Sequence, residues 1–407
     1  MEWKEVRLGD LYSVHNGLSK AGKYFGYGYP FLTFSDVFKN YFLPIEFGNK
    51  VDSTEKEQTN YNIKRGDVFI TRTSETADEL GMSSVALCDF PQATYNGFTK
   101  RLRPIDGEKI VLPEFIGYFL RSKSFRHNFF LLSGGMSTRA SLANADLLNM
   151  SVKLPPIHAQ RRIANILSSL DRKIELNNKI NAQLEEIAQA IFKSWFVDFE
   201  PFKDGKFVDS ELGLIPEGWR VGTLDEIASI TKKSINPQKS PGTLYSHYSL
   251  PAFDEGRRPV TQFGKEIMSN KTLFESKTTL ISKLNPHIKR IWFVNETKSN
   301  PICSTEFLPI KASNVAHCSF VHCLINSDWF YSRAVSGVNG ATTSHQRIHP
   351  EDILNQTIAV NIGIIEKFGK SVLPTLERIE HNIEESLRLS HLRDTLLPKL
   401  MNGEIEI

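Results

Sequence analysis

The strongest constraint on this chain is that its second half repeats its first. The segment Leu8–Val14 (LGDLYSV) aligns with Leu224–Ile230 (LDEIASI), and a tryptophan stands five residues before each. Further along, Phe115–Phe125 aligns with Phe320–Phe330. A period of about 200 residues is far too long for a solenoid repeat. The sequence therefore predicts two tandem copies of one domain, which can present two similar surfaces about a pseudo-twofold axis.

Each copy is followed by a stretch with the apolar spacing of a long helix. Apolar residues alternate at steps of three and four, which is the heptad pattern of a coiled-coil seam. The predicted seam consists of Ile163, Leu167, Leu170, Ile174, Asn177, Asn181, Leu184, Ile191, Trp195, Leu376, Ile379, Ile383 and Leu387. Polar residues in such a seam cost stability but fix register. We expect the two helices to pair with each other; the alternative is that each packs within its own domain.

The limits of the helices follow from glycine and proline. Neither residue type occurs between Ile163 and Phe196, so a helix over this range would be about 50 Å long. The second helix is predicted to begin after Pro374, with Pro398 and Gly403 marking its end.

The globular copies have the pattern of mixed α/β domains. Short β-rich runs such as VFITR and IWFV lie between glycine, proline and asparagine breaks, and helical patterns occur at Pro113–Phe130 and Ser319–Val335. We predict a first globular domain at 1–153, a helical region at 154–199, a linker at 200–215, a second globular domain at 216–361 and a second helical region at 362–407.

Charge and composition restrict the partners only weakly. Residues 1–153 carry 19 basic and 17 acidic residues, and residues 225–361 carry 15 and 11. This small basic excess suits phosphate-facing domains, but it is also compatible with chance. The four irregularly spaced cysteines make no disulfide framework, and no signal peptide or membrane span is recognisable, so we expect a cytoplasmic protein.

Motifs that resemble catalytic or metal sites are incomplete. Gly17–Lys23 has phosphate-loop spacing but is followed by Tyr24, where a magnesium ligand would be needed. The run His317–Cys323 (HCSFVHC) holds four ligand-type residues, whereas the first copy has Leu, Pro, Gly and Tyr there. Buried helix residues are the expected interpretation, and a zinc site in the second copy alone is the alternative. We expect no metal and no catalysis by this chain.

Two regions resemble a known family. Leu154–Phe202, which contains SWFVDFEPF, and the following IPEGWRVGTLDEIASI resemble the central region of the specificity subunits of type I restriction-modification enzymes. The ending LPTLERIEHNIEESLRLSHLRDTLLPKLMNGEI resembles their distal region. The resemblance covers the chain in the right order. One departure is His158-Ala159-Gln160, where the family often has a Glu-Gln pair.

The resemblance implies both a fold and a function. Each copy would be a target-recognition domain that reads one half of a bipartite, asymmetric DNA sequence, and the helices would form an antiparallel coiled coil that sets the spacer. Two modification subunits would bind S-adenosylmethionine and methylate adenine, and restriction subunits would cut DNA with ATP and Mg²⁺. This chain would hold no cofactor itself. The alternatives are a coiled-coil adaptor that joins two protein-binding domains without recognising DNA, and a fused enzyme, which the missing motifs argue against.

Candidate DNA contacts come from polar loops that occur in both copies. Such side chains hydrogen-bond to base edges and phosphates. The loop at 71–74 aligns with 282–285, and the loop at 137–139 aligns with 343–347. The predicted residues are Arg72, Thr73, Thr138, Arg139, Lys283, Asn285, His287, Lys289, Arg290, Ser344, His345, Gln346 and Arg347, with Arg101 and Arg103 added as phosphate contacts.

Overall fold

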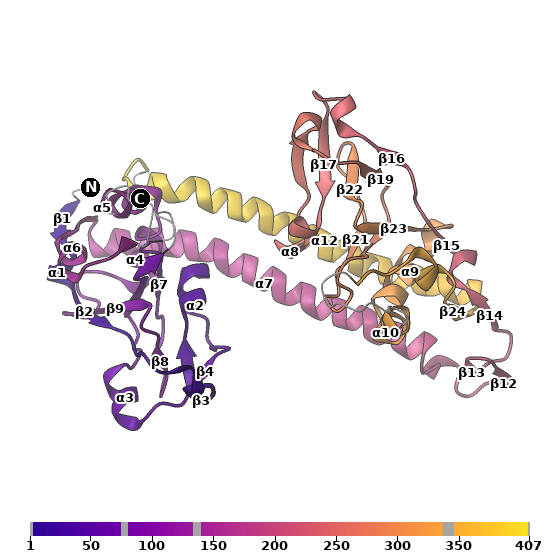
Figure 1. The fold of residues 1–407 in the computed structure, drawn as a ribbon, viewed down its shortest axis with the longest axis horizontal. Coiled ribbons are helices and arrows are strands. Elements are labelled where there is room, and N and C mark those ends of the chain that lie inside the picture. The colour runs from indigo at the N-terminus through magenta and orange to yellow at the C-terminus, as the bar shows by residue number, and fades with distance from the viewer. Residues whose placement is uncertain (1–2, 75–79, 133–139, 337–345, 406–407) are drawn as a thin grey trace. The chain divides into compact units, whose positions relative to one another are not determined.

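The computed structural model describes residues 3–74, 80–132, 140–336 and 346–405 (Figure 1). It divides into two compact units. Unit 1 combines Met1–Ile174 with Arg388–Ile407, and unit 2 is Glu175–Leu387. The two long helices, α7 (Ile157–Phe196) and α12 (Ile362–Met401), each contribute one part to either unit. The division of the sequence into five segments stays a prediction.

Unit 1 is built on a four-stranded antiparallel sheet in the order β2-β9-β5-β7. Its strands are β1 (Lys4–Arg7), β2 (Tyr12–Asn16), β3 (Phe25–Leu32), β4 (Lys50–Val51), β5 (Val68–Thr71), β6 (Thr73–Ser74), β7 (Ser83–Val85), β8 (Thr94–Tyr95), β9 (Thr99–Pro104), β10 (Ala140–Ser141) and β11 (Ser151–Leu154). Its short helices are α1 (Leu8–Leu11), η1 (Gly22–Tyr24), α2 (Phe34–Lys39), α3 (Glu55–Asn60), α4 (Pro113–Phe119), α5 (Lys123–Leu132) and α6 (Asn144–Asn149). Three smaller sheets complete the unit: β1-β11, β10-β6 and β4-β3-β8.

Unit 2 has a four-stranded antiparallel sheet in the order β15-β23-β20-β21 and a five-stranded sheet β16-β19-β22-β17-β18. Its strands are β12 (Phe207–Ser210), β13 (Gly213–Pro216), β14 (Arg220–Thr223), β15 (Ala228–Ile230), β16 (Ser234–Ile235), β17 (Leu244–Tyr248), β18 (Val260–Phe263), β19 (Lys271–Leu273), β20 (Thr278–Ser282), β21 (Ile291–Val294), β22 (Pro301–Ser304), β23 (Phe307–Ala312) and β24 (Thr357–Val360). Its short helices are η3 (Glu200–Phe202), η4 (Leu224–Glu226), η5 (Pro237–Lys239), α8 (Leu250–Asp254), η6 (Gly264–Glu266), η7 (Val315–His317), α9 (Cys318–Asn326), α10 (Asp328–Ser336) and α11 (Pro350–Leu354). The hairpin β12-β13 begins inside the predicted linker and ends one residue beyond it.

The sequence repeat is visible in the topology. In unit 1, β1 pairs with β11, and in unit 2, β14 pairs with β24; both pairs are antiparallel. The four-stranded sheets have the same strand order when the corresponding segments are matched. Both units are mixed α/β, so the prediction of two copies of an α/β domain is confirmed at the level of topology.

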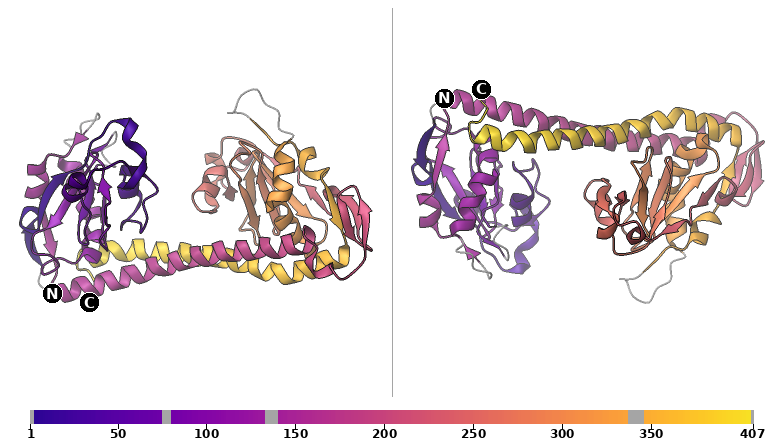
Figure 2. Two further views of the ribbon diagram at one scale, coloured as in Figure 1. Left: turned by 90° about the horizontal axis from the view of Figure 1, so that it is seen from below. Right: turned by 90° about the horizontal axis from the view of Figure 1, so that it is seen from above.

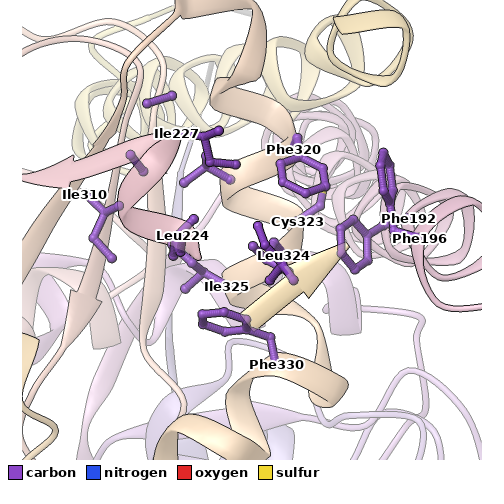
Figure 3. Close-up of a cluster of buried hydrophobic side chains, with 14 of the residues drawn as sticks. Phe192, Phe196, Leu224, Ile227, Ile310, Phe320, Cys323, Leu324, Ile325 and Phe330 are labelled. Carbon is purple, nitrogen blue, oxygen red and sulfur yellow. The ribbon is translucent and has the colours of Figure 1, made fainter. Parts of the chain in front are cut away.

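The long helices belong to the cores of the units. In unit 2, Phe192 and Phe196 of α7 pack beside Phe320 of α9, and the ring centres of Phe196 and Phe320 are 4.6 Å apart (Figure 3). In unit 1, Leu167 of α7 and Leu397 of α12 belong to one buried cluster. The sequence predicts pairing between the two helices, with packing of each helix within its own domain as the alternative. In the structure, parts of α7 and α12 contact each other and also belong to the cores of the units.

The observed helix limits correct one prediction. Helix α12 begins at Ile362, so Pro374 lies inside it. Proline has no amide hydrogen, so the carbonyl of Lys370, four residues earlier, lacks its usual helical hydrogen bond. Both residues are exposed, so water can bond to this carbonyl instead. The predicted end is confirmed: Gly403 has φ 72° and lies just beyond Met401, the last residue of the helix. In the described part of the chain, no helix is long and apolar enough to cross a membrane.

Candidate nucleic-acid interface

In unit 1, the structure places the predicted segment 71–74 beside the strand that follows the second predicted loop. Strand β6 pairs with β10, and the Leu142 amide donates to the Arg72 carbonyl at 3.1 Å. Thr73 lies in β6. Thr138 and Arg139 lie outside the described residues. The predicted segment 71–74 therefore lies beside residues 140–142, at the end of the inner strand β5.

In unit 2, the corresponding loops meet in the same way. The Asn285 amide donates to the Gln346 carbonyl at 3.1 Å, and the Ile348 amide donates to the Lys283 carbonyl at 3.0 Å. Asn285 has φ 50°, a conformation that asparagine adopts more readily than most residues. Ser344 and His345 lie outside the described residues. The pairing of loops is thus common to both copies.

A third element joins this loop pair in each unit, and sequence reasoning missed it. The Arg72 amide donates to the Phe98 carbonyl at 2.8 Å, and the Lys283 amide donates to the Glu306 carbonyl, also at 2.8 Å. Phe98 and Glu306 lie in the turns before β9 and β23. Asn96-Gly97, a common turn signal, precedes Phe98 and could have drawn attention to this turn.

The basic groups of unit 1 are not all available to a ligand. Arg101 is 3% exposed, donates to the Asn62 carbonyl at 2.6 Å and lies over the Tyr95 ring. Arg103 forms a two-pronged ion pair with buried Asp67, with N–O distances of 2.7 and 2.5 Å. Both arginines therefore make contacts within unit 1; Arg101 is almost fully buried, whereas the Arg103 side chain is 26% exposed, and their contact with phosphates stays a prediction.

Arg72 differs from these two arginines. Its guanidinium has no ion-pair or hydrogen-bond partner among the described residues. Burial lowers the pKa of Lys100, and the positive charge of Arg72 lowers it further. The two cations therefore share one local environment, in which an anionic group would be stabilised.

In unit 2, several predicted cations already have acidic partners. Arg290 binds Asp254 with two hydrogen bonds of 2.7 and 2.9 Å. Lys289 contacts Asp328 at 3.0 Å, and Arg347 contacts Glu306 at 3.0 Å. These pairs lie at or near the surface, where an ion pair contributes little and exchanges readily. A phosphate or base edge could compete for the same groups.

Lys283 and His287 have no acidic partner among the described residues. Neither side chain has an ion-pair or hydrogen-bond partner in the part of the chain that the structure describes. Lys283 is half-buried and His287 is exposed. Lys283 is the counterpart of Arg72, since both make the backbone bond to the turn described above. Each unit therefore presents one unpaired cation at the same place.

Residues of α7 and α12 contact each other through a polar layer in unit 2. The Asn382 side chain donates to Asn181 Oδ1 at 2.8 Å, and Asn177 donates to Glu385 at 2.8 Å and to Ser386 at 3.2 Å. Partners along α12 run in the reverse order to those along α7, so the two segments are antiparallel, and Figure 2 shows them side by side. The predicted seam residues are all buried or half-buried.

Each unit also fastens its globular part to these helices. In unit 1, the Tyr118 hydroxyl donates to Asp171 of α7 at 2.6 Å, and Arg393 of α12 donates to the same carboxylate at 2.7 Å. In unit 2, Glu380 of α12 accepts the amides of Asn295 and Glu296, each at 3.2 Å. Burial raises the pKa of Glu380 to about 7.

The ligand-type residues of His317–Cys323 lie on η7 and α9. Cys318 and Cys323 are buried, and burial raises the pKa of both thiols. His322 is buried, with Nδ1 3.4 Å from the Thr279 hydroxyl. Among the described residues, no three histidine, cysteine or acidic side chains converge as metal ligands would.

Comparison with known proteins agrees with the sequence resemblance. Residues 1–186 match the family described as Type I restriction modification DNA specificity domain. The chain is similar to the MjaIX specificity subunit of Methanocaldococcus jannaschii, with 28% identity over 100% of this chain and 94% of that one. It is 24% identical to the HindI specificity subunit of Haemophilus influenzae, over 99% and 100% of the two chains.

A solved structure has the same fold. The S subunit of a type I restriction-modification system from M. genitalium superposes with a TM-score of 0.59 at 15% identity, covering 98% of this chain and 96% of that one.

Proposed function

Since the chain belongs to the family of type I restriction-modification specificity subunits, we propose that each unit reads one half of a bipartite, asymmetric DNA target. A specificity subunit is the non-catalytic member of its complex, so the chemistry lies in other subunits. The observation that carries the proposal is the loop pair with one unpaired cation, Arg72 or Lys283, which occurs in both units with different neighbours. Similar folds with different side chains suit two different half-sites.

The helices would set the spacer between the half-sites. We propose that α7 and α12 form an antiparallel coiled coil with pseudo-twofold symmetry. A helix of 40 residues is about 60 Å long, whereas half-sites read from one face of DNA lie about 34–36 Å apart. The antiparallel contacts at Asn177 and Asn181 support this arrangement.

The proposal also assigns the partners. Two modification subunits that bind S-adenosylmethionine would dock on the helices and methylate adenine. Restriction subunits that use ATP and Mg²⁺ would join them.

The test is to map methylated adenines after the chain is combined with its modification subunits. Arg72→Ala should weaken discrimination in one half-site only, and Lys283→Ala in the other. Each substitution should also lower the slope of log affinity against log salt by about one, the effect of one lost phosphate contact. Lys203→Ala is the control, because the Lys203 side chain is 62% exposed, lies outside both long helices and contacts Glu200 at 3.6 Å. A chain that joins proteins without selecting any DNA sequence would support the adaptor alternative instead.

A further inference from the structure

A groove opens in unit 1 beside the turn that precedes β9. Its volume is about 390 Å³, and its lining includes Phe25, Arg72, Asn96 and Phe98. The turn is held by backbone bonds from the Asn96 amide to Leu32 and from the Thr99 amide to Asn96, at 3.1 and 3.2 Å. The groove is therefore attached to a well-supported part of the sheet.

Two side chains of the groove, Phe98 and Asn96, lack the contacts that such residues usually make in folded proteins. Phe98 is 64% exposed, although phenylalanine is usually buried. Asn96 is only 9% exposed, and its Oδ1 accepts no hydrogen bond from the described residues. Buried amide oxygens are almost always paired, because an unpaired one loses its hydration without compensation. A hydrogen-bond donor that enters the groove would satisfy this oxygen.

The second copy has different chemistry at the same place. Glu306 of unit 2 makes the same backbone bond to Lys283 that Phe98 makes to Arg72. Its carboxylate contacts Arg347 at 3.0 Å. One unit thus presents an exposed aromatic ring where the other presents a carboxylate, so this position distinguishes the two surfaces.

We propose that the groove reads an A·T base pair in the half-site bound by unit 1. In the major groove, adenine offers an amino donor and the N7 acceptor, which match an asparagine amide, and thymine offers a methyl group, which matches an apolar side chain. Asn96 contacts the adenine, Phe98 packs on the thymine methyl group, and Arg72 holds the adjacent phosphate. This inference rests on the proposed function and names a specificity-determining residue within it.

The test uses the full chain with its modification subunits and duplexes that carry the mapped target. Each thymine of the half-site read by unit 1 is replaced in turn by uracil, which keeps the pairing and removes only the methyl group. One replacement should weaken binding about fourfold, the effect of one methyl group removed from water. In the Phe98→Ala variant, the same replacement should have no effect.

Ile105→Ala is the matched control. Ile105 is 55% exposed and follows the opposite end of β9, so this variant should keep the full difference between thymine and uracil. A complex that selects its target but shows no thymine dependence, or the same dependence after Phe98→Ala, overturns this inference alone. A complex that selects no DNA sequence overturns the proposed function as well.

Discussion

The contact among Tyr118, Asp171 and Arg393 allows a quantitative test of how unit 1 is fastened to its helices. The Tyr118 hydroxyl is fully buried and donates to Asp171 at 2.6 Å, while Arg393 binds the other carboxylate oxygen at 2.7 Å. A hydrogen bond to a charged group contributes about 1.5–3 kcal/mol. Asp171 is 27% exposed, so water can replace a lost donor. Tyr118→Phe should therefore lower the free energy of unfolding by about 1.5 kcal/mol.

Asp171→Ala should cost more, because it leaves two groups without a partner. The Tyr118 hydroxyl would stay buried with no acceptor, and Arg393 would lose its interior partner, for a total of about 3 kcal/mol. In the Tyr118→Phe background, only the loss at Arg393 remains, about 1.5 kcal/mol. The double-mutant cycle should thus give a coupling energy of about 1.5 kcal/mol.

The measurement is hydrogen exchange of α4 peptides as a function of urea, which reports the unfolding of unit 1 within the full chain. Asp394→Ala serves as the control, because Asp394 is 58% exposed and contacts the same arginine at the surface; its cost should stay below about 0.5 kcal/mol. A coupling energy near zero, or equal costs for Asp394→Ala and Asp171→Ala, would refute this account of the contact.

Three further predictions concern titration, reactivity and catalysis. Burial raises the pKa of Glu380 in the folded chain from 4.5 to about 7, so between these pH values the folded state holds a proton that the unfolded state has lost. Unit 2 should therefore lose stability as pH rises from 4.5 to about 7. Glu380→Gln should remove that part of the pH dependence of the melting temperature. A thiol-alkylating reagent at pH 8 should modify exposed Cys88 rapidly and buried Cys323 only after denaturation, which peptide mass spectrometry reads directly; equal rates would contradict the described packing. The purified chain should transfer no methyl group to DNA, and adenine methylation should appear when the modification subunits are added; activity of the chain alone would contradict its non-catalytic role.

Aligned segments of the two halves predicted the repeat, and heptad spacing predicted the long helices. The same rules failed at Pro374, since a proline ends a helix only where the lost hydrogen bond cannot be replaced, and this one lies on an exposed face. Aligning the two copies predicted the segments that contain Arg72 and Lys283 as candidates, but their hydrogen bonds to residues distant in the sequence are visible only in the structure.

The side-chain environment of the candidate site was harder to predict. Arg101 and Arg103 are of the residue type that commonly binds phosphate. In the structure, however, Arg101 donates to Asn62 and Arg103 pairs with Asp67, and both partners are distant in sequence. Phe98 was missed because aromatic residues are expected in the core, and its exposure depends on the geometry of the preceding turn. Base-reading residues stay a prediction, because hydrogen-bond donors and acceptors acquire their direction only from the folded loops.

The discontinuous make-up of unit 1 has a consequence for synthesis on the ribosome. Leu397, Leu400 and Met401 belong to the same buried cluster as Leu8 and Leu167, yet they are translated after the whole of unit 2. The first 174 residues emerge without part of their core, whereas the contiguous unit 2 can be completed earlier. Unit 1 therefore completes its core after unit 2, and a stop codon between Leu387 and Leu397 would remove part of the core of unit 1 while leaving unit 2 whole.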